Sequence, residues 1–219
     1  MQSGLQHRVL ADAILPDFAS DSKISSYAKD IVLIMSFVLI MTLSAQIVIK
    51  LPGTVVPITG QTFGALLAGG ALGSKRGPIS MIVYMLIGMF GAPVFAVSGS
   101  VLAENQSVHF ITPWAGSSGL IWSMASGGYI FGFIFASYLI GKLSEKGWDR
   151  QSKVILSMFL GYVVIYEFGL PWLMINLSAS LSDTLLWGLW PFIPGDALKL
   201  VLASLALPGA WAIVDRVKK

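Results

Sequence analysis

The chain has 219 residues, of which 55% are hydrophobic and 11% are charged, and its mean hydropathy is +0.78. A soluble domain carries roughly 25% charged residues, so the composition excludes an ordinary soluble protein and indicates an integral membrane protein. The absence of cysteine excludes disulfides and thiolate metal sites, and the net charge of +3 is typical of cytoplasmic membrane flanks rather than of nucleic-acid binding.

Residues 1–26 are mixed and polar. Asp12, Asp17 and Asp21 interrupt any apolar run, so no secretory signal is visible. We interpret this stretch as a cytoplasmic N-terminal extension with a short amphipathic turn around Val9–Leu15. The remaining residues, 27–219, form the predicted membrane domain.

Six apolar segments follow in the chain. The second is rich in glycine and alanine and is too short to cross the hydrocarbon upright, so we expect a short helix buried in the bundle. The sequence therefore predicts an all-α, six-helix membrane bundle, with segments at 27–49, 61–73, 79–95, 127–142, 154–177 and 195–214.

Basic residues indicate how this bundle is oriented. Six segments place both termini on one side, and of the 14 Lys and Arg residues only Lys50 and Lys199 fall on the other. Basic residues concentrate on the cytoplasmic side of membrane proteins, so we expect both termini to be cytoplasmic. The two longer outer connections are 98–118, which has no Lys or Arg and is predicted to be a flexible lid, and 178–194, which is predicted to be a loop.

The stretch Pro194-Gly195-Asp196-Ala197-Leu198-Lys199 places a carboxylate and an ammonium three residues apart where the last segment begins. Pro and Gly favour a helix start here, which would bring Asp196 and Lys199 onto one face of the first turn. Asp196 could serve only to complement the helix dipole and Lys199 only to pair with it. A lone cation on the outer side is better explained by a ligand or a buried partner.

Other polar residues within the apolar segments have two interpretations each. Glu167 faces either a cavity or a neighbouring helix to which it hydrogen-bonds. Gln61 either caps the second segment or contacts a ligand, and Tyr84 is either a core aromatic with a satisfied hydroxyl or part of a site. The tryptophans are typical of an interfacial belt.

Motifs for catalysis are not found. The chain has no Gly-Lys-Ser/Thr phosphate loop, no H-E-x-x-H and no G-x-S-x-G, so it has no visible means of hydrolysing ATP. The best interpretation is a non-enzymatic bundle with an outward-facing pocket. The alternatives are a small membrane enzyme that uses Glu167 and His109, and a carrier, channel or structural protein that works without an ATPase.

Four motifs resemble those of one family. VPITGQTFGALLAGGALGSKRG (56–77), SGGYIFGF (126–133), GLPWL (169–173) and FIPGDALK (192–199) are similar, in this order, to the BioY-type S components, the biotin-binding subunits of energy-coupling-factor transporters. The resemblance covers about residues 27–219. It implies a multi-pass protein of the cell (inner) membrane that captures biotin with high affinity from outside.

The resemblance also implies partners and a site. A transmembrane coupling subunit and ATPase subunits would be the partners, and ATP would be used only there, with no cofactor or metal in this chain. Asp196 and Lys199 are the prime binding positions, with Gln61 and the Gly127-Gly128-Tyr129 turn nearby. Tyr84, Glu167 and Trp172, which the resemblance does not single out, complete the expected ligand-binding set as polar or aromatic residues of the apolar segments.

The chain departs from the family pattern in two places. The sequence after GAPVF (91–95) carries an insertion, which lengthens the outer loop, and the first segment has no clear Ala-x-x-x-Ala for docking on a coupling subunit. The ligand chemistry nevertheless fits. Asp196 can accept hydrogen bonds from the ureido N–H groups of biotin, Lys199 can donate to its ureido carbonyl or carboxylate, and aromatic side chains can cover its ring.

Overall fold

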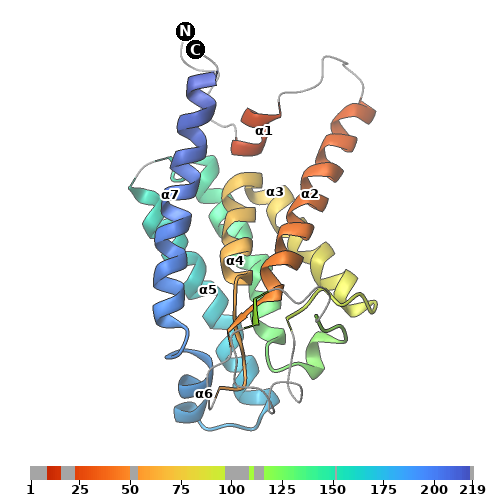
Figure 1. Ribbon diagram of the computed structural model, residues 1–219, viewed down its shortest axis with the longest axis vertical. Helices are drawn as coiled ribbons and strands as arrows, with labels where there is room; N and C mark the ends of the chain where they lie inside the picture. Colours follow the sequence, from red (N-terminus) through yellow and green to blue (C-terminus); the bar gives the residue numbers. More distant parts are fainter. Residues whose placement is uncertain are drawn as a thin grey trace.

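A computed structural model describes residues 9–15, 23–49, 54–96, 109–110, 116–150 and 152–217. Long helices run roughly along one axis and form an elongated bundle (Figure 1). Four of the described helices are long and apolar enough to cross a membrane: residues Ser26–Gln46 of α2 (Lys23–Gln46), α4 (Gly127–Glu145), α5 (Lys153–Asn176) and α7 (Ile193–Val217).

The helix α3 (Gln61–Met89) is not continuous. Gly73 has φ 83°, a left-handed conformation that favours glycine, and it breaks the helical geometry. A Cβ atom on Gly77 would lie 3.1 Å from the carbonyl oxygen of Ala68, although nine residues of straight helix would separate them by about 13 Å. The chain therefore reverses at Gly73. The predicted short glycine-rich segment is a helix of its own that packs against the helix after it.

Close helix packing depends on small residues, as the sequence predicts. The most extensive helix contact is between α3 and α4. A Cβ atom on Gly69 of α3 would lie only 2.5 Å from the carbonyl oxygen of Ser137 in α4. A larger side chain there would separate the two backbones.

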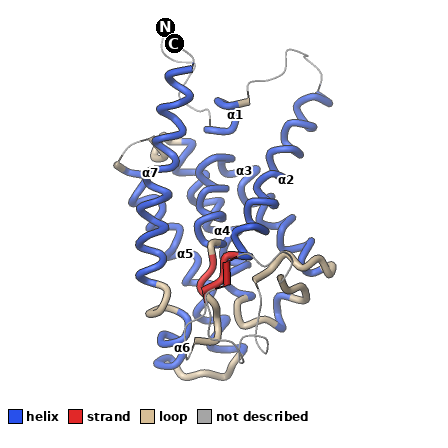
Figure 2. Tube along the Cα trace, viewed as in Figure 1, coloured by secondary structure: helices blue, strands red, loops and turns tan. Residues whose placement is uncertain are grey.

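A small antiparallel sheet, absent from the prediction, lies where α2 meets α3 (Figure 2). Its strand order is β2-β1-β3, with β1 at Ile47–Ile49, β2 at Ile58–Thr59 and β3 at His109–Phe110. Val48 pairs with Thr59 on one side and with His109 on the other. The first segment was predicted to be helical through residue 49. It leaves the helix after Gln46, because the β-branched run Ile-Val-Ile fits a strand.

Two further predictions differ from the structure. Residues 178–194, predicted to be a loop, contain the helix α6 (Leu181–Gly188), whose first turn is capped by the Ser180 hydroxyl accepting from the Asp183 N–H. The third segment ends as a helix at Met89, and Phe95 beyond it pairs with Ser117 in an isolated bridge. Most of the predicted lid at 98–118, including the insertion, lies outside the described residues.

The two ends of the bundle differ. One end, called the basic end below, comprises α1 (Leu10–Ile14), the turn at Gly73, the α4–α5 turn and the last turn of α7. Figure 1 shows α6 at the opposite end, called the α6 end. The helix α1 matches the expected turn at Val9–Leu15 and packs against α3 and α7 with Leu10, Ala11 and Ala13 buried. A short 3-10 helix, η2 (Ile121–Ser123), precedes α4.

Candidate ligand-binding site

An ion pair lies in the first turn of α7. The helix begins at Ile193, as the Pro-Gly pair predicts, and the backbone N–H of Asp196 donates to the Phe192 carbonyl at 2.8 Å. Three residues later on the same face, the Lys199 ammonium lies 2.9 Å from Asp196 Oδ1. The side chains of Asp196 and Lys199 are only 9% and 14% exposed. Such a buried pair is stable only when its remaining donors and acceptors are also satisfied.

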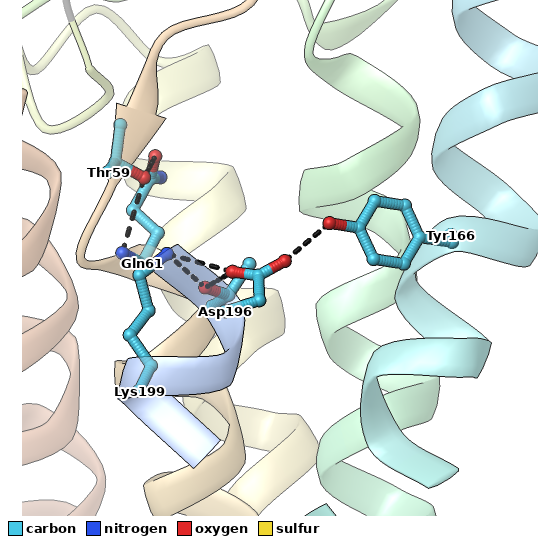
Figure 3. Close-up of polar contacts among 6 residues, drawn as sticks. Thr59, Gln61, Tyr166, Asp196 and Lys199 are labelled. Atoms are coloured by element: carbon cyan, nitrogen blue, oxygen red, sulfur yellow. Dashed lines mark hydrogen bonds and ion pairs between the residues drawn. The ribbon is translucent and has the colours of Figure 1, made fainter. Parts of the chain in front are cut away.

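Hydroxyl groups from two other helices supply these partners. Lys199 Nζ donates to Thr62 Oγ1 at 3.0 Å, and the Thr62 hydroxyl lies 3.4 Å from Asp196 Oδ1. The Tyr166 hydroxyl of α5 donates to Asp196 Oδ2, so both carboxylate oxygens are engaged (Figure 3). Below, these four residues are called the polar network, and they join α3, α5 and α7.

Gln61 stands beside the polar network as the first residue of α3 (Figure 3). The Thr59 hydroxyl at the end of β2 lies 3.0 Å from Gln61 Oε1, so the small sheet helps to orient this amide. The Gln61 amide nitrogen donates to the Tyr84 hydroxyl at 2.8 Å, and this hydroxyl donates to the Val94 carbonyl at 2.9 Å. Tyr84 is fully buried, so its hydroxyl holds the Gln61 amide in place from the interior of the bundle.

A cavity of about 280 Å³ adjoins these groups. This volume is near the lower end of the range of about 300–1,000 Å³ for small-molecule sites. Its polar wall carries Gln61, Thr62, Tyr166 and Lys199. Apolar side chains provide much of the remaining lining, including Val56, Met124, Ile130, Phe133, Ile165 and Phe192. A few convergent polar groups on an apolar cavity are the usual composition of a binding site for a small organic molecule.

Tyr129 joins this cavity to the α6 end. Its ring lines the cavity, stacks on Phe192 with centroids 6.4 Å apart and meets Tyr166 edge to face. The Tyr129 hydroxyl donates to the carbonyl of Gly188, the last residue of α6, at 2.9 Å. The chain between α5 and α7 is therefore anchored directly beside the cavity.

Five candidate residues do not line this cavity: Asp196 and Tyr84, which hydrogen-bond the lining residues Lys199 and Gln61, and Gly127, Trp172 and Glu167. A Cβ atom on Gly127 would lie 2.0 Å from the Ile121 carbonyl oxygen, so glycine is required there for backbone packing. Trp172 donates from Nε1 to the Met124 carbonyl at 3.0 Å and thus holds the segment before α4. Glu167 lies on the exposed face of α5, away from the cavity.

Sequence reasoning missed Thr62 and Tyr166, which complete the network. Both are ordinary residues in their segments, and their roles arise only when α3 and α5 are placed against α7. One signal was available, because Thr62 follows Gln61 directly at the helix start, where polar side chains usually have a partner. Tyr166 had no comparable signal, and the charged residue that follows it, Glu167, was predicted to lie in the site instead.

Taken together, these features define a helical membrane protein with a buried ion pair beside a small-molecule cavity. The model of the BioY family matches residues 17–106 and 110–216, and the chain belongs to this family. The chain is therefore a multi-pass protein of the cell membrane.

Relatives and one solved structure agree with this assignment. "Biotin transporter BioY" of Rhizobium etli is 32% identical over 186 residues, which cover 81% of this chain and 90% of that protein. "Probable biotin transporter BioY" of Pyrococcus horikoshii is 30% identical over 177 residues, or 80% and 92%. The crystal structure at 2.1 Å of the S-component for biotin from an ECF-type ABC transporter shares this fold, with a TM-score of 0.68 and 24% identity over 91% of this chain and 95% of that one.

Proposed function

We propose that this chain captures biotin outside the cell as the S component of an ECF-type, ATP-driven transporter. The observation that carries the proposal is the polar network on the wall of the cavity, in a chain of the BioY family. Relatives that span most of the chain are named biotin transporters. The role is binding and delivery, without catalysis.

The chemistry of the cavity suits this ligand. Biotin has two ureido N–H donors, a ureido carbonyl, an apolar thioether ring and a carboxylate. Asp196 accepts from N–H groups and Lys199 donates to an oxygen, so one small polar head replaces part of their mutual pairing. Gln61 offers an amide, and the rings of Tyr129 and Phe192 offer apolar surface for the thioether ring.

The candidate residues take different roles in this proposal. Asp196, Lys199, Gln61 and Tyr129 contact the ligand, whereas Tyr84, Gly127 and Trp172 position the residues and backbone around it. Thr62 and Tyr166 join the set because they hold the two charges. Glu167 is not among the proposed biotin contacts, because its side chain is exposed on α5.

The binding test uses purified protein and labelled biotin. We expect about one biotin retained per chain, recovered chemically unchanged and without added nucleotide. Release of an altered product would instead support a membrane enzyme, and transport without retention would support a channel or carrier.

The proposed topology has six membrane segments: α2, the two halves of α3 on either side of Gly73, α4, α5 and α7, with the basic end and both termini in the cytoplasm. Its support is the position of the ten described Lys and Arg residues. All except Lys199 belong to elements of the basic end or to helix turns that adjoin it.

Single introduced cysteines can test this topology, because the sequence has no native cysteine that would react with the label. In intact cells, an impermeant thiol reagent should label Ser182→Cys in α6 but not Lys75→Cys. Labelling of both from outside would contradict the topology.

Energy must come from other chains in this account, because the sequence has no nucleotide-binding motif. We propose a transmembrane coupling subunit and ATPase subunits as partners, with ATP hydrolysed only by them. Uptake in proteoliposomes should become concentrative only when these subunits and ATP are present. Concentrative uptake by this chain alone, without ATP or an ion gradient, would exclude such an arrangement.

A further inference from the structure

A second hollow lies on the other side of Tyr166, between α5 and α7. This α5–α7 groove has a volume of about 760 Å³ and is more open than the biotin cavity. Tyr166 lines both spaces, and Asp196 lines the groove while its partner Lys199 lines the cavity. Most of the groove is apolar, with Phe159, Val163, Leu170, Pro171, Leu189, Ile193, Ala197 and Leu200 in its lining. A groove of this composition on a membrane protein suits an acyl chain.

Glu167 is the feature that apolar contact does not explain. Glu167 is among the residues that line the groove, and it lies on the exposed face of α5, next to Tyr166. Among the described residues, no ion pair involves Glu167 and no basic side chain lines the groove. A charge facing lipid is costly and needs a counter-charge. The described part of the chain provides none, so the membrane is the natural source.

Tyr162 lies between the groove and the polar network. Its ring lines the groove, the residue is 5% exposed, and its hydroxyl lies near Thr62 and Asp196 without a hydrogen bond of normal geometry. Tyr162 lies five residues nearer the basic end of α5 than Glu167. This spacing places Tyr162 about 7 Å deeper along the helix axis.

The depth of the groove fits a phospholipid. Tyr166 binds Asp196, which is the fourth residue of α7 and lies about 5 Å along the axis from the helix start. The 25 residues of α7 span about 37 Å, which exceeds a hydrocarbon thickness of about 30 Å. Glu167 therefore lies within about one or two turns of the membrane interface at the α6 end. A head group can reach Glu167 there, and the acyl chains of the same lipid lie deeper, along the apolar lining.

We propose that the α5–α7 groove binds a phospholipid whose head group carries an ammonium, of the ethanolamine class. The ammonium pairs with Glu167, and one acyl chain lies along the apolar lining, which includes the ring of Tyr162. An anionic head group such as glycerol phosphate is disfavoured, because its charge has the same sign as Glu167. This site does not depend on which ligand occupies the cavity beside Lys199.

The test measures lipids retained by the full chain. Protein is reconstituted in nanodiscs with equal amounts of phosphatidylethanolamine and phosphatidylglycerol of identical acyl chains, then released and examined by native mass spectrometry. Wild-type protein should retain phosphatidylethanolamine in preference, and Glu167→Gln should reduce this preference about five- to tenfold. Ala197→Phe fills the groove and should reduce retention of both lipids. Leu198→Phe, on the neighbouring exposed residue outside the groove lining, is the matched control and should not.

Three outcomes overturn the proposal. Equal lipid retention by wild-type protein and Glu167→Gln removes the role of the carboxylate. A preference for phosphatidylglycerol reverses the assigned charge. A photo-crosslinking residue at position 197 that captures a polypeptide and no lipid makes the groove a helix-docking face. Thermal unfolding of each variant is measured alongside, and if Ala197→Phe does not fold, Glu167→Gln decides.

Discussion

At the basic end, Arg76 joins separate helices, whereas at the α6 end an ion pair lies within a single turn of α7. At the basic end, Arg76 of α3 bonds Asp12 of α1 at 2.8 Å and Asp30 of α2 at 2.7 Å. At the α6 end, Asp196 and Lys199 already neighbour each other along α7, and their other contacts are hydroxyls beside a cavity. The Arg76 pairs therefore hold α1, α2 and α3 together. The α6-end pair holds two charged groups ready for a ligand.

If the two ends of the bundle differ in this way, substitutions at the α6 end should reduce biotin affinity more than they reduce stability. We expect Asp196→Ala and Lys199→Ala each to weaken biotin binding by about 2–5 kcal/mol, part of which is the cost of leaving the other charge buried and unpaired. Asp196→Asn should cost less, because its amide oxygen still accepts a hydrogen bond. Isothermal titration of the folded variants measures these differences. Wild-type affinity in both alanine variants would show that Asp196 and Lys199 only stabilise the start of the helix.

A smaller effect is expected from Tyr166→Phe, which removes the hydroxyl from Asp196 Oδ2 without changing the ring. Hydrogen bonds to charged groups contribute about 1.5–3 kcal/mol, and we expect a loss of biotin affinity of about 1.5 kcal/mol. Tyr162→Phe, one turn away on the same helix, is the matched control, because among the described residues its hydroxyl makes no hydrogen bond of normal geometry to Asp196. Equal affinities of the two variants would show that the Tyr166 hydroxyl does not position Asp196.

At the basic end, Arg76→Ala should lower stability and leave biotin affinity unchanged. The Arg76 side chain is 20% exposed and its acidic partners are 30% and 37% exposed. Its loss should therefore cost about 1 kcal/mol, between the values for surface and for buried pairs. Lys142→Ala, which breaks a more exposed pair with Glu145 at 3.7 Å, should cost less. Thermal unfolding measures the stability of each variant, and titration measures its biotin affinity. A large affinity loss in Arg76→Ala would contradict the proposed difference between the basic end and the α6 end.

The smallest predicted effect concerns pH and Asp149, in the α4–α5 turn. Burial raises the pKa of this carboxyl, although the hydrogen bond from Trp211 at 2.6 Å opposes the shift. A raised native pKa means that the folded protein binds more protons than the unfolded chain between the two pKa values. Stability contributed by Asp149 is therefore greatest below that window and falls as pH rises through it. Asp149→Asn, which can still accept from Trp211, should flatten this part of the pH dependence of thermal unfolding, and an unchanged slope would contradict the assignment.

Sequence patterns predicted the long helices and the start of α7 well, because hydropathy and the Pro194-Gly195 pair act locally. A turn was also expected at residues 74–78, after the glycine-rich segment, but the chain reverses at Gly73 and residues 74–78 are helical. Hydropathy could not separate the strand β1 from the end of α2, since Ile47–Ile49 continue the apolar run. The helix α6 was missed although Ser180 and Asp183 form a local capping pattern.

The site was only partly predictable for a related reason. Asp196 and Lys199 stood out because they are charges in an apolar segment, and their pairing is local. Thr62 is 137 residues from Lys199, so its role depends on how α3 packs against α7. Glu167 was expected in the site because charges are rare in such helices. Each residue of an α-helix is rotated by about 100° from the one before it. Because Tyr166 faces Asp196, Glu167 lies on a different face of α5.

The most direct test of the central claim is the structure of the chain with biotin bound. We expect the ligand to occupy the cavity of about 280 Å³, with its ureido group or carboxylate within hydrogen-bond distance of Asp196 and Lys199. Its thioether ring should lie against Tyr129 or Phe192. Biotin bound elsewhere, with the Asp196–Lys199 pair and its Thr62 contact unchanged, would contradict the account.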